Sequence, residues 1–229
     1  LWGRNSEIDP ENPTNIMAQG WLLHQKALMG ISESPMDDLR QAHQMGLNAL
    51  EKNPDHAMLL ALTATLEGMF GNFDASCARA EKLERLAREI NEIVMTAETQ
   101  RQCGKYKKSI ETYEKAFRIS PHYSSWIKQH YTYALLQNGD LEAAKKYALE
   151  QSVHEHFHSG INESFDAMLA YIYQKEGDEN LAKEHFEKQK NMKNSRTKKI
   201  IMNNFSSVRS KVFMNDFIKV LRSMGMPDQ

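Results

Sequence analysis

The sequence has no long apolar run and almost no imbalance of charge. None of its apolar stretches reaches the length that a membrane-spanning helix needs. It carries 29 Lys and Arg residues against 30 Asp and Glu residues, a net charge of −1. A chain without a basic excess is poorly equipped to neutralise phosphate groups. We therefore expect neither a membrane segment nor a nucleic-acid partner.

Cysteine is scarce, and the motifs of common catalytic sites are missing. The two cysteines, Cys77 and Cys103, both fall within the helical pattern described below, and we interpret them as reduced thiols of a cytoplasmic protein. The sequence contains no glycine-rich phosphate loop and no nucleophile elbow. We therefore expect no catalytic residue and no cofactor.

One short motif could still carry chemistry. His154, Glu155 and His158 match H-E-x-x-H, which on a helix places two imidazoles on one face for zinc and supplies a general base. A Ser-Gly pair interrupts the segment at once, and the segment lies at a junction between two helical hairpins. Adventitious metal binding by these histidines and His156 fits better than a zinc-dependent hydrolase, so we expect no functional metal site.

What the sequence does contain is a repeated spacing. The same series starts at Asp37, Gly71, Gly104, Gly139 and Gly177, which are 34, 33, 35 and 38 residues apart. Small or apolar residues follow each start at fixed intervals: Ala42, Gly46 and Ala49; Ser76, Ala80 and Leu83; Ser109, Tyr113 and Ala116; Ala144 and Ala148; Ala182 and Phe186. A small residue also stands seven positions before each start: Gly30, Ala64, Ala97, Thr132 and Ala170. Small residues at matched positions allow two helices to approach closely.

This spacing resembles that of the tetratricopeptide repeat family, in which each unit of about 34 residues is a hairpin of two helices. The resemblance covers residues 15–190 and implies an all-α fold. We expect an α-solenoid of about five such hairpins in a right-handed superhelix, closed by a C-terminal capping helix. Residues 1–14 are then a linker from an upstream domain, and residues 191–229 are a connector followed by the cap.

The resemblance also implies a binding surface. In this family the first helices of successive hairpins line a concave groove that grips a protein or peptide. Matching the groove positions gives ten candidate binding residues: Glu98, Arg101 and Gln102 in the third unit; Gln129, His130, Tyr133 and Gln137 in the fourth; and Tyr171, Gln174 and Lys175 in the fifth. Self-association is a further kind of contact that such a surface allows.

Two stretches sharpen the resemblance. Residues 118–147 and 217–229 are similar to the repeat region that follows the catalytic domain in bacterial class III adenylate and guanylate cyclases. The residues that carry the similarity are Ser120, Pro121, Tyr123 and Trp126, then Leu221, Arg222, Gly225 and Pro227. This implies a non-catalytic sensory or assembly region. Similar repeats also accompany winged-helix transcription regulators, which is the alternative.

Overall fold

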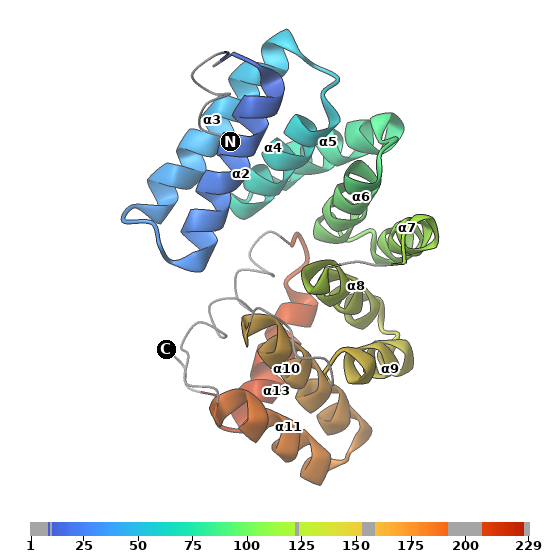
Figure 1. Ribbon diagram of the computed structural model, residues 1–229. Coiled ribbons are helices and arrows are strands. Elements are labelled where there is room, and N and C mark those ends of the chain that lie inside the picture. The colour runs from blue at the N-terminus through green and yellow to red at the C-terminus, as the bar shows by residue number, and fades with distance from the viewer. Residues whose placement is uncertain (1–8, 10, 122–123, 153–158, 192–207, 227–229) are drawn as a thin grey trace. The chain divides into compact units, whose positions relative to one another are not determined.

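All regular structure in the described part of the chain is α-helical (Figure 1). The computed structural model describes residues 9, 11–121, 124–152, 159–191 and 208–226. Its helices are α2 (Pro13–Met29), α3 (Pro35–Lys52), α4 (Ala57–Met69), α5 (Phe73–Leu86), α6 (Ile90–Gln102), α7 (Tyr106–Ile119), α8 (Ser125–Asn138), α9 (Leu141–Ser152), α10 (Ser159–Glu176), α11 (Glu179–Asn191) and α13 (Val212–Ser223). The predicted all-α class is confirmed. Among these residues, no helix combines the length and the apolar character that crossing a membrane requires.

The chain divides into two compact units. Unit 1 consists of residues 1–104 and 206–209, and unit 2 of residues 105–205 and 210–229. The division after Gly104 falls between α6 and α7, the two helices expected to form the third hairpin.

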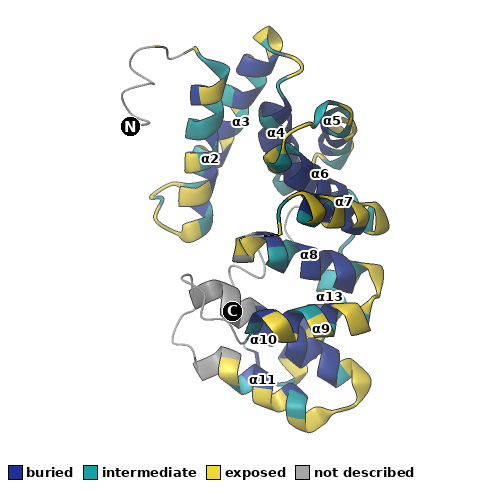
Figure 2. Ribbon diagram, turned by 45° about the vertical axis from the view of Figure 1, so that its right-hand side comes forward, coloured by how far each residue is buried: buried dark blue, intermediate teal, exposed yellow. Residues whose placement is uncertain are grey.

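The hairpins of unit 1 are held by close contacts at the predicted small residues. Helix α2 packs against α3, and α4 packs against α5. The Ser76 hydroxyl of α5 donates a hydrogen bond of 2.7 Å to the carbonyl oxygen of Ala64 in α4. Both residues belong to the repeated series, and both are buried. Helix α4 is buried along almost its whole length (Figure 2), as its nearly uniform apolar sequence indicates.

Unit 2 repeats this plan with small residues on both helices of each pair. Thr132 of α8 and Ala144 of α9 have no exposed surface, and neither have Ala170 of α10 and Ala182 of α11. An aromatic cluster joins α7, α8 and α9, in which Tyr131 lies 5.9 Å from Tyr113 and 5.0 Å from Tyr147 between ring centroids. The tyrosine of the third repeat is therefore a core residue.

The turns between paired helices require glycine. Gly71, Gly104, Gly139 and Gly177 have φ angles of 83°, 79°, 88° and 84°, a region that residues with a Cβ rarely adopt. All four were chosen as repeat starts, and their position just before a second helix is confirmed.

In the first hairpin, one of the predicted small contact residues lies outside the contact between the helices. Gly30 was expected among the small residues at the contact between helices, but it ends α2 as its C-cap with a φ of 69°. Helix α3 begins at Pro35, two residues ahead of the series start at Asp37, and proline is well suited to the first turn of a helix. Gly20 of α2 makes a close approach to the next hairpin, where an added Cβ would lie 2.4 Å from Leu62 of α4.

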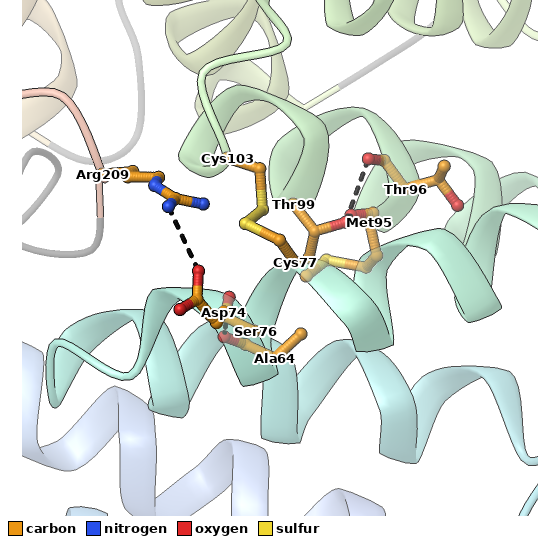
Figure 3. The surroundings of a disulfide bond; sticks show 9 residues. All are labelled: Ala64, Asp74, Ser76, Cys77, Met95, Thr96, Thr99, Cys103 and Arg209. Carbon is orange, nitrogen blue, oxygen red and sulfur yellow. Dashed lines mark hydrogen bonds and ion pairs between the residues drawn. A yellow bond between two sulfur atoms is a disulfide. The ribbon is translucent and has the colours of Figure 1, made fainter.

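The two cysteines are paired, so their interpretation as reduced thiols is wrong. Cys77 of α5 and Cys103, which follows α6, form a disulfide with their Cα atoms 5.7 Å apart (Figure 3). Stacking brings the second helix of one hairpin beside the first helix of the next, and α5 packs against α6. Because disulfides are typical of oxidising compartments, the argument for a cytoplasmic location loses its support.

The disulfide should stabilise unit 1 measurably. Replacing both cysteines, Cys77→Ser with Cys103→Ser, opens a loop defined by a sequence separation of 26 residues. We expect a loss of about 3 kcal/mol in the free energy of unfolding, chiefly from the greater entropy of the unfolded chain. Urea denaturation followed by circular dichroism measures it. The wild-type protein in excess dithiothreitol is the control and should show the same loss. Equal stability of the oxidised wild type and the double variant would contradict the assignment.

Candidate ligand-binding face

The ten candidate residues lie on three first helices, as the repeat pattern predicts. Three are on α6 in unit 1, and the other seven are on α8 and α10 in unit 2, where these two helices contact each other. Most are more buried than a ligand-binding role suggests. Glu98, Arg101, Gln102, Gln129, Tyr133 and Tyr171 are buried; His130, Gln137 and Gln174 are half-buried; Lys175 is exposed.

On α6, the candidate residues bind one another. The Arg101 guanidinium donates from Nε to Glu98 Oε2 at 2.9 Å and from Nη2 to Oε1 at 2.6 Å. The amide of Gln102 donates to Glu98 Oε1 at 3.1 Å. Glu98 and Arg101 are almost fully buried, and two parallel hydrogen bonds compensate part of the cost of burying their charges. This arrangement fits a structural ion pair at least as well as a ligand contact.

The end of α6 also contacts a C-terminal segment of the chain. The backbone N–H of Arg209 donates to the carbonyl oxygen of Gln102 at 2.8 Å. Its guanidinium lies 3.1 Å from the carboxylate of Asp74, close to the disulfide (Figure 3). The preceding residue, Val208, has no exposed surface. Residues 208 and 209 therefore pack against unit 1 beside a candidate binding residue.

On α8, the candidate residues alternate between core and surface. Gln129 and Tyr133 are buried, whereas Gln137 is half-buried near the end of the helix. The imidazole of His130 meets the edge of Trp126 with ring centroids 5.8 Å apart. Trp126 is 41% exposed, so this end of α8 presents an aromatic surface to solvent.

On α10, two candidate residues converge on one carboxylate. The Tyr171 hydroxyl donates to Asp216 Oδ2 at 2.7 Å, and the Lys175 ammonium donates to Asp216 Oδ1 at 2.9 Å. Asp216 belongs to α13, which packs against α10 (Figure 1). The ring of Tyr171 also lies 5.5 Å from that of Phe213 and 5.0 Å from that of Phe217.

The titration of these groups follows from the same contacts. Burial alone would raise the pKa of Asp216, but hydrogen bonds from Lys175 and Tyr171 hold it below its usual value. Burial and the hydrogen bond to Asp216 raise the pKa of Tyr171 well above its ordinary value. At neutral pH Asp216 is therefore a charged acceptor that faces the neutral hydroxyl of Tyr171.

Sequence reasoning assigned α13 as a cap and did not identify Asp216 as a binding partner. The available signal was the pattern of Phe213, Asp216 and Phe217, which places two aromatic rings and a carboxylate on one side of a helix. This pattern does not indicate that the same side of the helix packs against α10.

The H-E-x-x-H motif lies outside the described residues, since its histidines fall within residues 153–158. Within the described ranges, no group of three or more His, Cys, Asp or Glu side chains is placed to hold a metal ion. The expectation that the motif has no zinc-dependent role stays a prediction.

Paired helices, glycine turns and small contact residues at a period near 34 define a helical-repeat protein of the solenoid class. A family model described as tetratricopeptide repeat matches residues 31–206, and the chain belongs to this family. A comparison with curated protein sequences gave no significant match. Tetratricopeptide repeats are typically non-catalytic and generally bind other proteins.

Solved structures show the same fold at low sequence identity. A tetratricopeptide repeat protein from Parabacteroides merdae is 14% identical with a TM-score of 0.57, over 88% of this chain and 75% of that one. A thermophilic tetratricopeptide repeat protein from Thermus thermophilus is 15% identical with a TM-score of 0.55, over 80% of this chain and 98% of that one. The Cut9–Hcn1 hetero-tetramer of the APC/C is 11% identical with a TM-score of 0.62, over 98% of this chain but 45% of that one.

A stability measurement can test whether the Glu98–Arg101 pair has a structural role in the fold. Glu98→Ala leaves the Arg101 charge buried without its bidentate acceptor, so we expect unfolding to become easier by about 3–5 kcal/mol. Asn91→Ala, at an exposed position of the same helix, is the control and should cost less than about 0.5 kcal/mol. Urea denaturation compares the two variants. A Glu98→Ala variant as stable as the control would show that the pair is not needed for folding.

Proposed function

We propose that this chain is a non-catalytic protein-interaction module that binds a protein or peptide segment on the first helices of its hairpins. The observation that carries the proposal is membership of a family whose members generally bind proteins through these helices. The polar side chains Gln137, Gln174 and Lys175 supply donors and acceptors that are not wholly buried. A ligand would meet these side chains first, because the other candidates, including Glu98 and Tyr133, are buried within their own units.

The proposal extends to the protein from which the chain derives. The similarity of residues 118–147 and 217–229 to the repeat region of bacterial class III adenylate and guanylate cyclases supports a sensory or assembly role next to a catalytic domain. These cyclases act as dimers, so a repeat module that binds a partner or self-associates would set activity by shifting a population of states. A cytoplasmic location is no longer part of the proposal, because it rested on reduced cysteines.

Peptides selected from a random phage-displayed library against the chain test the binding face. We expect the selected peptides to bind the Lys175→Ala variant at least ten-fold more weakly than the wild type, measured by isothermal titration calorimetry. Lys183→Ala is the matched control, since Lys183 is also exposed but lies on the second helix of the same hairpin. Selected peptides that bind both variants with equal affinity would place the ligand elsewhere and contradict the proposed face.

The parental role has its own test. In the full-length protein, deletion of residues 15–229 should change either the rate of cyclic nucleotide formation or the oligomeric state, because the module is proposed to control both. Activity assays and sedimentation velocity measure the two quantities on the same preparations. Unchanged activity together with an unchanged oligomeric state would reject the regulatory role. An upstream winged-helix domain in place of a cyclase domain would favour the alternative parent.

A further inference from the structure

We infer that the face of α10 that carries Tyr171 and Lys175 is a docking site for an amphipathic partner helix with the pattern Phe-x-x-Asp-Phe. Helix α13 is its resident occupant, and a partner helix of this chemistry replaces it. The inference rests on the proposed function and specifies the chemistry of the ligand.

Helix α13 shows what the site accepts. Phe213, Asp216 and Phe217 stand three and four residues apart, so their side chains project from one side of the helix. Phe217 is fully buried, and its ring lies 5.5 Å from that of Phe213. This is the arrangement by which an amphipathic helix is recognised: apolar anchors at helical spacing, with a polar group that fixes orientation.

Helix α10 supplies the complementary groups. The Tyr171 ring contacts both phenylalanine rings, which accounts for the aromatic pair. The Tyr171 hydroxyl and the Lys175 ammonium both donate to Asp216, and Lys175 also lies 5.5 Å from the centroid of the Tyr171 ring. Two donors, one of them cationic, select a carboxylate over an amide or a hydroxyl.

The polar part of this contact is accessible to water, whereas Phe217 and Leu221 of α13 are fully buried. The side chains of Lys175 and Asp216 are 36% and 40% exposed, and an ion pair so open to water contributes little to stability. Helix α13 has 12 residues, a length at which an isolated helix is barely stable in water. Because α13 belongs to the same chain, a partner competes with an effective concentration on the order of millimolar. A substitution that weakens the packing of α13 on α10 should therefore allow an added helix to bind this face of α10.

The test uses the full chain and a fluorescein-labelled peptide with the sequence of residues 210–226. Asp216→Lys removes the shared acceptor and places a second cation near Lys175. Asn215→Lys introduces a lysine at the neighbouring exposed position of α13 and is the control. By fluorescence anisotropy, we expect the peptide to bind the Asp216→Lys chain with a Kd at least ten-fold lower than that for the Asn215→Lys chain.

A reversal of charge tests the chemistry of the site. The Lys175→Asp chain should prefer a peptide with the Asp216→Lys change over the wild-type peptide by at least ten-fold, because the roles of the two charges are exchanged. If Asp216→Lys loses cooperative unfolding by circular dichroism, Asp216→Asn replaces it, with Asn215→Ala as control and an expected difference of at least three-fold. Equal affinities in either matched comparison overturn the inference. The inference is also overturned if the wild-type chain sediments as a dimer in which two copies exchange α13.

The two proposals fail in different experiments. If library-selected peptides bind the wild type and the Lys175→Ala variant with equal affinity, the proposed function is rejected. This holds whether or not the α13 peptide binds. An α13 peptide that binds the Asp216→Lys and Asn215→Lys chains equally rejects this inference. It leaves a Lys175-dependent library ligand, and with it the proposed function, in place.

Discussion

The close approach of the paired helices within each unit is the constraint on which the rest of the structure depends. In α4 and α5 the Ser76 hydroxyl reaches the backbone of Ala64, which requires a small side chain on both helices. The equivalent positions of α10 and α11 are occupied by Ala170 and Ala182, neither of which has exposed surface. A larger residue at any of these positions would separate the helices and force the neighbouring side chains out of their preferred rotamers. The turn glycines follow from the same requirement, since only a short turn joins helices that lie so close.

This constraint explains why most candidate binding residues are buried. A first helix lies between its own partner helix and the neighbouring hairpin, so few of its side chains meet water, as α4 illustrates. Polar residues on such a helix need partners within the fold. Glu98 and Arg101 provide this for each other. Position on a first helix is therefore not enough to identify a ligand contact, and exposure must be considered as well.

The sequence predicts the helical class and the turns because both depend on local patterns. It failed for Gly30, which ends α2 as its C-cap, because a residue at a helix end is placed by capping and not by the repeat. It also failed for Cys77 and Cys103, since their pairing joins neighbouring hairpins and requires knowledge of how these stack.

The partner of the α10 residues was missed for a related physical reason. Asp216 and Arg209 lie beyond the repeated series, so no equivalent position in another unit predicts their contacts. Sequence could place Tyr171 and Lys175 on a binding face, but it could not show that another part of the chain contacts that face. A repeat pattern describes how neighbouring hairpins meet and contains no information on a segment that lacks the pattern.

Differences between the repeats at one equivalent position account for where α13 binds. Two residues before the turn glycine, the successive units carry Met69, Gln102, Gln137 and Lys175. Only the last is charged, and it is also the most exposed, because the other three are buried or half-buried. The charged residue stands where the position reaches water, and there a cation can recruit a carboxylate without the cost of full burial. Asp216 pairs with Lys175, which of these four residues is both charged and exposed. The contact with α13 thus arises where one unit differs from the others at an equivalent position.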